Sequence, residues 1–419
     1  ATILPYKENY TTSKAAAASL WVSDFYKHSK FKKTNYIFGS TDTKDFLTKN
    51  YINIKINNIK SKFSSSTNEY CKNFIKKNKK LNFDIIEIHN RPLVFVQLKK
   101  ILSSKFILYF HNDPLTMKGS KTKEERLALL NSIDKIIFVS KWVQKQFFIN
   151  LDNKLIHKTE IVYPSISKAL KNPLKLKKIT FVGKLNESKG YDIYGDAIIK
   201  ILDKFDDWKA YSIGDESRNK PQFHHSNHED LGYLTHKKVL KFLETSEIAV
   251  VPSRWEEPFG RTALESTSRG CATIISNRGG LPETSDHSII LDKLNSRELF
   301  KAIDKLITNN KFRKKIQLDG FNNVKHLLKE NSALIDDIRE ELMPSFKLNY
   351  NKNRLRIVNI YNLGQKLNHR LYNISLGKKF TNGFIRNNHD VLEISDRDFI
   401  KQNRGFSLKT SEIKFQEYL

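Results

Sequence analysis

The chain has few residues that could cross-link its fold or interrupt its helices and strands, because its 419 residues include only two cysteines and ten prolines. Cys71 and Cys271 cannot build a disulfide framework, which favours a reducing cytoplasm. No apolar run approaches the roughly 20 residues of a membrane-spanning helix, and the first residues resemble a strand instead of a signal peptide. The hydrophobic content of 39% predicts a globular chain of two or three domains. We therefore expect a cytoplasmic protein.

The positive charge of the chain is large but widely spread. There are 73 Lys and Arg against 45 Asp and Glu, which gives a formal net charge of +28. Such a charge favours anionic partners, namely nucleic acid, acidic lipid or a phosphorylated substrate. Lysine is frequent along the whole sequence, however, and no helix-turn-helix, zinc-finger or RNA-recognition pattern is present. We expect no nucleic-acid partner, and a charge-driven nucleic-acid binder stays an alternative.

Short apolar strands alternate with helical segments in two series. The first series predicts strands at 3–4, 34–39, 52–56, 85–89, 106–111, 135–140 and 160–163, and the second at 179–183, 208–214, 248–251, 272–276 and 288–291. The clearest predicted helices are 14–30, 123–132, 236–244 and 296–309. This alternation is typical of doubly wound sheets. The predicted fold class is α/β, with one Rossmann-like domain in residues 1–165 and another in residues 166–329.

The most informative segment is residues 250–283. An apolar strand leads into a loop with Glu257, and Gly260 then opens a helix that contains Glu265. A second short strand ends at Gly279-Gly280. Both strand-to-helix turns therefore lie at the edge of the sheet where parallel sheets bind ligands. The alternative is an ordinary βαβ unit whose acidic residues complement the helix dipoles.

This order of residues resembles a known family. Glu257-Pro258-Phe259-Gly260, followed by Glu265, is similar to the Glu-x7-Glu signature of retaining glycosyltransferases of family 4, the glycosyl transferases group 1. Gly279-Gly280-Leu281-Pro282-Glu283 resembles the Gly-Gly-x-x-Glu turn of that family. The resemblance implies the GT-B fold, in which two Rossmann-like domains face a central cleft. It also implies that a last helix, here about 330–345, returns to the first domain.

The resemblance further implies how the second domain binds a nucleotide-sugar donor. Gly183-Lys184 and Lys189 resemble the family's Gly-Arg-Leu and Lys-Gly, whose basic residues bind the diphosphate. Lys184 stands where Arg is commoner, so it keeps the charge but loses the bidentate geometry. Surface lysines without a role are the alternative for this turn.

The two glutamates and the turn between them complete the implied donor site. Glu265 is expected to accept hydrogen bonds from the ribose hydroxyls, and Glu257 to hold a hydroxyl of the donor sugar. The backbone N–H groups of Phe259 and Gly260 are expected to bind the sugar from the helix start, where unpaired donors are available.

In the first domain, His111 follows a strand and matches a family histidine that contacts the donor sugar. The alternative is a structural histidine that caps the loop. His89-Asn90-Arg91-Pro92, after the previous strand, is a candidate for acceptor contact. The family commonly has a Gly-rich turn after its first strand, but this chain has the alanines of residues 15–18. Either the Gly-rich turn is absent, or Thr11, Thr12 and Ser13 take its role.

These residues predict a retaining hexosyltransferase. His111, Glu257 and Lys189 are the expected catalytic residues. No cluster has metal-ligand spacing, so lysines instead of a divalent ion are expected to offset the leaving-group charge. The donor is expected to be a UDP- or GDP-sugar, and the acceptor a saccharide or lipid in envelope polysaccharide, lipopolysaccharide or glycolipid synthesis. A non-catalytic Rossmann-type scaffold protein is the alternative from another class.

Two further features bear on organisation and location. Residues 346–419 predict a strand, a helix and a strand, and they resemble the start of a second Rossmann-type glycosyltransferase unit. Basic residues alternate with aromatic residues in 21–33 and 74–80, which is compatible with peripheral contact at the cytoplasmic face of an anionic inner membrane. Aromatic residues buried in a core are the equally weighted alternative for these two segments.

Overall fold

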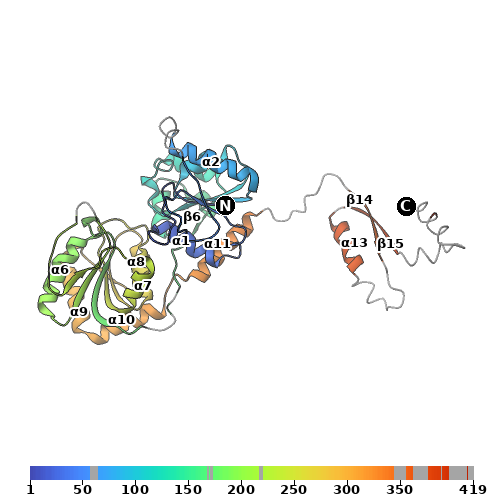
Figure 1. Ribbon diagram of the computed structural model, residues 1–419. Coiled ribbons are helices and arrows are strands. Elements are labelled where there is room, and N and C mark those ends of the chain that lie inside the picture. The colour runs from blue at the N-terminus through green and yellow to red at the C-terminus, as the bar shows by residue number, and fades with distance from the viewer. Residues whose placement is uncertain are drawn as a thin grey trace, which may run out of the picture. The chain divides into compact units, whose positions relative to one another are not determined.

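A computed structural model provides the structure of the chain. It describes residues 1–56, 65–167, 169, 173–216, 220–343, 355–361, 376–387, 389–395 and 413. The chain divides into two units, Ala1–Met343 and Pro344–Leu419. The first unit contains two parallel sheets with their helices, and the second contains a two-stranded sheet (Figure 1).

The first sheet has seven parallel strands in the order β3-β2-β1-β4-β5-β6-β7. They are β1 (Thr2–Ile3), β2 (Ile37–Gly39), β3 (Tyr51–Asn53), β4 (Ile85–His89), β5 (Lys105–Phe110), β6 (Lys135–Phe138) and β7 (Thr159–Ile161). The helices of this half are α1 (Ala17–His28), α2 (Ser66–Leu81), α3 (Pro92–Lys99), α4 (Lys123–Ser132), α5 (Lys141–Phe148), η2 (Pro114–Thr116), η3 (Asn153–Lys158) and the late helix α11 (Leu328–Leu342). The strand order reverses between β1 and β4, and such a switch point opens a crevice for ligands.

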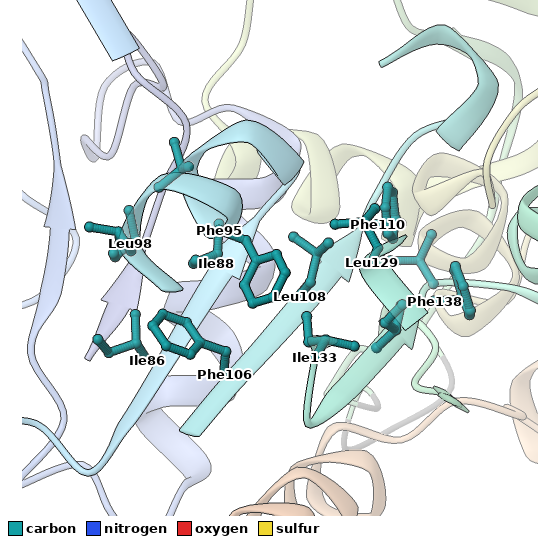
Figure 2. Close-up of a cluster of buried hydrophobic side chains, with 14 of the residues drawn as sticks. Ile86, Ile88, Phe95, Leu98, Phe106, Leu108, Phe110, Leu129, Ile133 and Phe138 are labelled. Carbon is teal, nitrogen blue, oxygen red and sulfur yellow. The ribbon is translucent and has the colours of Figure 1, made fainter. Parts of the chain in front are cut away.

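Alternating side chains place helices on both faces of this sheet. One face buries the cluster of Figure 2, with side chains of β4, β5 and β6 packed against α3 and α4: Ile86, Ile88, Phe95, Leu98, Phe106, Leu108, Phe110, Leu129, Ile133 and Phe138. The intervening residues Ile107 and Tyr109 belong to a separate cluster with Trp21 of α1 and Ile335 of α11. Strands buried on both faces are the mark of a doubly wound parallel sheet.

The second sheet has six parallel strands in the order β10-β9-β8-β11-β12-β13. They are β8 (Leu176–Val182), β9 (Lys209–Ile213), β10 (His228–Asp230), β11 (Ser246–Val251), β12 (Ala272–Ser276) and β13 (Ile289–Leu291). The helices are η4 (Glu187–Lys189), α6 (Tyr191–Lys204), α7 (His236–Thr245), α8 (Arg261–Ser268), η5 (Leu281–Glu283), α9 (Ser296–Thr308) and α10 (Asn310–Asn322). Figure 1 shows α6 and α9 on one side of the sheet and α7 and α8 on the other. The predicted pair of Rossmann-like α/β domains is therefore confirmed.

Helix α11 is tied to the first sheet by a buried ionic network. Arg339 donates through Nε and Nη2 to the two carboxylate oxygens of Glu87 in β4, at 2.6 and 2.9 Å. Its Nη1 donates to Asp336, which also accepts a 2.6 Å hydrogen bond from Ser29 after α1. Burial lowers the pKa of the Arg339 guanidinium, but the charge of Glu87 outweighs this and raises it, so the pair is ionised. The chain thus returns from the second half to pack on the first, although the predicted domain boundary at 165/166 stays a prediction.

The second unit contains β14 (Arg356–Tyr361), α13 (Leu376–Arg386) and β15 (Asp390–Ser395), and its two strands pair in parallel. The predicted strand, helix and strand are therefore present among the residues that the structure describes. Glu393 of β15 accepts hydrogen bonds from Lys378 and Thr381 of α13, which hold the helix on the sheet. That this unit begins a second glycosyltransferase domain stays a prediction.

Several aromatic side chains of the two basic-aromatic segments are in the core, whereas Tyr26 and Phe31 are partly exposed. Trp21, Phe25 and Phe74 are buried, because they lie on the core-facing sides of α1 and α2. These three side chains fit the core interpretation, and peripheral membrane contact stays a prediction. Within the described residues, no helix combines the length and apolar character needed to cross a bilayer.

Candidate active site

A cavity of about 330 Å³ lies between the two halves of the first unit. Its walls come from the β1–α1 loop and α1, from the carboxyl ends of β4 and β5, and from the loops after β8 and β11. The lining residues are Glu8, Ala17, Ala18, Trp21, Asn90, His111, Asn112, Val139, Pro164, Lys189, Trp255, Glu257, Pro258, Phe259, Gly260 and Arg261. Five of the predicted site residues thus meet in one place: His111, Lys189, Glu257, Phe259 and Gly260.

The Gly-Gly turn after β12 positions Glu257. Gly280 N donates a 2.6 Å hydrogen bond to the backbone oxygen of Glu257. Gly279 has a φ of 57°, and a Cβ on it would lie 2.1 Å from that same oxygen, which is far inside van der Waals contact. Only glycine allows this approach, so the Gly-Gly-x-x-Glu motif acts here as the support under the Glu257 loop.

Lys189 and Glu257 form an ion pair at the cavity wall. Lys189 Nζ lies 2.5 Å from Glu257 Oε1, and the two side chains are 23% and 11% exposed. The same ammonium lies 4.4 Å from the ring centroid of Trp255, a cation–π contact. Gly190, with a φ of 72°, lets this turn pack against the backbone oxygen of Pro252, which brings Lys189 towards Glu257. A cation and an anion are therefore presented side by side to the cavity.

Behind this pair, two basic side chains keep the carboxylate of Glu265 ionised. Its Oε1 accepts 2.7 Å hydrogen bonds from Nε2 of His236 and from Nε of Arg261. Burial alone raises the pKa of Glu265, but the hydrogen bond from His236 and the charge of Arg261 outweigh it and lower the pKa to about 2. Both partners bind the same oxygen, and no hydrogen bond to the other oxygen, Oε2, is found among the described residues.

Arg261 connects the two halves and has an unused donor. Its Nη2 donates a 2.7 Å hydrogen bond to Asp24 of α1, in the first half. Its buried Nη1 has no hydrogen-bond partner among the described residues. A buried N–H without an acceptor costs about 1–3 kcal/mol, so such a group at a cavity wall is a candidate ligand donor.

The first half contributes a pair of neutral histidines. His89 Nδ1 and His111 Nε2 lie 2.8 Å apart, and Trp21 packs edge-on against both rings. Burial lowers the pKa of His111 to about 3, and burial followed by the nearby His111 lowers that of His89. His111 N also donates a 2.7 Å hydrogen bond to Oδ1 of Asn90. At neutral pH the pair shares one N–H and carries no charge.

The alanine-rich segment leads into helix α1 at the cavity wall. Helix α1 begins after Ala16, and Ala17 and Ala18 line the cavity. Thr12 and Ser13, proposed to take over the loop's role, instead donate to Oδ2 of Asp45 at 2.9 and 3.0 Å. The closest polar group of this loop to the cavity is Glu8, whose pKa is raised by burial.

Direct hydrogen bonds hold the two halves together beside the cavity. The carboxylate oxygens of Glu283 accept from the backbone N–H groups of Lys141 and Trp142, at 2.8 and 2.9 Å, at the start of α5. Ser140 Oγ donates a 2.5 Å hydrogen bond to the backbone oxygen of Pro258. The last residue of the Gly-Gly-x-x-Glu motif is therefore an interdomain contact.

The remaining predicted residues lie near the cavity but not on its wall. Gly183 and Lys184 follow β8, and the Lys184 side chain is exposed. Glu265 lies behind Arg261, which does line the cavity. Sequence reasoning missed the roles of Asp24, His236 and Trp255, because their contacts join residues far apart in the chain. Across the described part of the chain, no group of three or more metal-binding side chains comes together.

Two parallel Rossmann-like sheets that face a common cavity form the GT-B fold that the sequence predicted. Residues 162–321 match the family described as Glycosyl transferases group 1, so the chain carries a group 1 glycosyl transferase domain. The resemblance predicted from the sequence is confirmed, and the protein is a glycosyltransferase enzyme.

Curated relatives and solved structures agree with this assignment. Spore coat protein SA of Bacillus subtilis is 26% identical over 275 residues, covering 57% of this chain and 72% of that protein. An uncharacterized glycosyltransferase of Methanocaldococcus jannaschii, MJ1178, is 33% identical over 233 residues, covering 53% of this chain and 64% of that protein, slightly less than two thirds. The crystal structure of Anabaena HepE in complex with UDP-glucose has a TM-score of 0.64 at 13% identity, covering 81% of this chain and 99% of that one. The structural likeness shows the fold.

Proposed function

We propose that the protein is a retaining hexosyltransferase that takes a sugar from a UDP- or GDP-sugar and needs no divalent metal. The observation that carries this proposal is the arrangement of Lys189, Glu257 and Arg261 around one cavity opposite His111. These groups offer positive charge for a diphosphate and hydrogen-bond acceptors for hydroxyls in the same space. Anabaena HepE, which has the same fold, is seen with UDP-glucose.

The charged groups of the second half are assigned to the nucleotide and its diphosphate. Lys189 and the free Nη1 of Arg261 supply the positive charge and the N–H donor that phosphate oxygens require. Glu265 Oε2 accepts from the ribose hydroxyls, since an ionised carboxylate is an acceptor only. Gly183 and Lys184 add a second basic contact from the end of β8. We therefore assign the neutralisation of the diphosphate charge to these basic side chains and not to a metal ion.

The sugar is assigned to the space between the halves. Glu257 accepts from one hydroxyl, while the N–H groups of Phe259 and Gly260 lie at the start of α8. His111 contacts the sugar through its Nδ1, because Nε2 is engaged with His89. The imidazole is neutral, so it binds a hydroxyl without adding a positive charge beside the reacting carbon.

The reaction proceeds on one face of the sugar. The bond between the anomeric carbon and the phosphate oxygen breaks, and Lys189 with Arg261 stabilises the charge that collects on the diphosphate. The acceptor hydroxyl attacks from the side of the departing phosphate, which takes up the hydroxyl proton. The new glycosidic bond therefore keeps the anomeric configuration. Glu257 is committed to hydrogen bonds, so it is not assigned as a nucleophile.

The acceptor is assigned to a saccharide or lipid-linked saccharide of envelope polysaccharide, lipopolysaccharide or glycolipid synthesis. We assign the enzyme to the cytoplasm, with or without peripheral contact at the cytoplasmic face of an anionic inner membrane. The group 1 family supports a glycosyltransferase activity, and the net charge of +28 favours an anionic surface or acceptor.

A binding and turnover screen tests the donor assignment. Thermal stability is measured with UDP-, GDP- and ADP-sugars, each in the presence of EDTA, for the wild type and for Glu265→Gln. We expect stabilisation by one nucleotide class in the wild type, and a loss of most of that shift in the variant. Product anomeric configuration is then read by NMR. Inversion of configuration, or dependence of turnover on Mg²⁺, contradicts the corresponding part of the proposal.

The competing function is a Rossmann-type scaffold without turnover. It predicts nucleotide binding without sugar transfer or donor hydrolysis, so a turnover assay on the same samples separates the two. The third candidate, a charge-driven nucleic-acid binder, predicts salt-dependent oligonucleotide retention and no nucleotide-sugar response.

A further inference from the structure

A second cavity, of about 720 Å³, lies in the first half beside the candidate active site. It is formed by the segments that directly follow β1, β2 and β3, three adjacent parallel strands of one sheet. Its lining includes Tyr6, Lys7 and Asn9 after β1, Thr43 and Lys44 after β2, and Lys55 after β3. The cavity therefore lies at the ligand-binding edge of the sheet, as the active site does.

The lining carries an excess of positive charge. Lys7, Lys44 and Lys55 contribute three ammonium groups, whereas Asp42 is the single carboxylate on the wall. Among the described residues, no carboxylate lies within ion-pair distance of any of these three lysines, in contrast to the paired Lys189. The net charge of the lining is about +2, since three cations face one anion, and an anion is the natural complement of such a concave surface.

The walls are held in place by side-chain hydrogen bonds. Asp45, in the middle of the β2–β3 loop, accepts from Thr43 at 2.6 Å and from Thr12 and Ser13 of the β1–α1 loop at 2.9 and 3.0 Å. Asn53 exchanges two hydrogen bonds with the backbone of Thr41, at 2.7 and 2.9 Å. The loops are thus fixed before any ligand arrives, which lowers the entropy cost of binding.

The two cavities share the β1–α1 loop as a wall. Lys7 and Asn9 line the second cavity, and Glu8 between them lines the active site. Lys7 adopts a φ of 64°, a conformation that side chains other than glycine seldom adopt and that concentrates at functional sites. A molecule bound in the second cavity is therefore next to the site of sugar transfer, on the side of the first domain.

We propose that this cavity binds a phosphate group carried by the acceptor, an inference that rests on the proposed glycosyltransferase function. A phosphate monoester carries about −1.5 to −2 charges at neutral pH, which complements a lining of about +2 better than a single carboxylate does. The lysines bind its oxygens together with the side-chain amide of Asn9, whereas the hydroxyl of Thr43 is already donated to Asp45. The acceptor's reacting hydroxyl then extends past Glu8 into the active site.

The phosphate could belong to a soluble sugar phosphate or to a lipid headgroup, and binding assays separate these sources. The donor site is first saturated with the nucleoside diphosphate selected by the donor screen. Glucose 6-phosphate is compared with glucose by calorimetry, and vesicles with phosphatidic acid are compared with phosphatidylcholine vesicles by sedimentation. We expect at least about tenfold tighter binding of one phosphorylated probe than of its neutral counterpart. No preference for either phosphorylated probe overturns the proposal.

Charge-matched variants show whether this cavity is responsible. Lys7→Ala/Lys44→Ala/Lys55→Ala removes the three cavity lysines, and Lys76→Ala/Lys77→Ala/Lys79→Ala removes three exposed lysines from α2. We expect the first triple variant to lose the phosphate preference and the second to keep it. Equal losses in both assign the effect to overall charge and contradict the site. Each variant's thermal midpoint, with and without the nucleoside diphosphate, verifies folding and donor binding.

Transfer assays distinguish failure of this inference from failure of the proposed function. If the wild type neither binds a nucleoside diphosphate nor hydrolyses a donor, the proposed function itself fails. If it hydrolyses the donor and the cavity variant transfers sugar to the phosphorylated acceptor with unchanged KM, only the phosphate site is refuted. The expected outcome is an increase of about tenfold in acceptor KM with donor hydrolysis retained.

Discussion

The two halves of the active site recognise ligands by different means. The first half presents the neutral His111, which is paired with the buried His89, together with an indole, two amides and the carboxyl group of Glu8. The second half presents charged groups, namely the ion pair of Lys189 with Glu257 and the guanidinium of Arg261, which Glu265 pairs from behind the wall. Neutral donors and acceptors suit the hydroxyls of a sugar, whereas fixed charges suit a diphosphate. The difference indicates that the second half binds the charged diphosphate, whereas both halves bind the hydroxyls of the sugar.

The largest expected effect follows from removing charge in the second half. Lys189→Ala leaves the leaving diphosphate without its ammonium partner, so kcat should fall by about 100- to 1,000-fold. Lys200→Ala, on the exposed side of α6, is the matched control and should retain kcat. Steady-state kinetics on both variants provides the measurement. Comparable losses in the two would mean that Lys189 has no special role.

Removing the neutral group opposite should have a smaller effect. His111→Ala deletes one uncharged hydrogen bond to the sugar, so kcat/KM should fall by about tenfold. Affinity for the free nucleoside diphosphate should stay unchanged, since that ligand has no sugar to contact. Titration calorimetry with the diphosphate tests this separation, and a parallel loss of diphosphate affinity would show that the halves do not divide the donor as we infer.

The neutral state of the histidines also predicts how stability depends on pH. His111 has an ordinary pKa of 6.5 that burial lowers to about 3, so the unfolded chain binds a proton below about pH 6.5 that the folded chain does not. Stability therefore falls as pH decreases from about 6.5 towards 3. The thermal midpoint should drop between pH 7 and 5, and the drop should be smaller in His111→Gln. A drop of the same size in both would exclude His111 as its source.

The smallest expected effect concerns the residue that positions Glu265. His236→Gln keeps a hydrogen-bond donor near Oε1, whereas His236→Ala removes it and leaves Arg261 as the remaining partner. Donor KM should rise about threefold in the alanine variant, because one hydrogen bond to Glu265 is lost while the one from Arg261 remains. The value of kcat should change little. Rescue by glutamine is the readout that a merely destabilising substitution would not produce.

Local signals predicted much of the fold. Residues 123–132 were predicted as a helix and form α4 with the same bounds, because Thr122 and Glu125 make a capping box at its start. Strand β10, His228–Asp230, was not predicted, because three polar residues show no apolar alternation and are set by pairing with β9. Helix α1 begins only at Ala17, later than the predicted residue 14, since the preceding segment bonds to the β2–β3 loop.

The residues of the candidate site also fall into those that local sequence predicted and those that only the fold brings together. The resemblance pointed to Glu257, Gly260 and Lys189, which are close in sequence to recognisable turns and meet in the cavity. Asp24 and Arg261 are 237 positions apart in the sequence, and no local pattern predicts a contact between such residues. The second cavity could not be predicted from the sequence either, because it brings together single lysines from three separate loops in a chain where lysine is common.

The contact of Glu283 with the start of α5 has a consequence for handling the protein. The amides of Lys141 and Trp142 form the kind of helix start that binds free anions, and here the second half's own carboxylate occupies it. We therefore expect dissolved phosphate or sulfate to compete with Glu283 for those amides and to weaken this contact between the two halves, so the buffer anion has to be kept constant in every binding measurement.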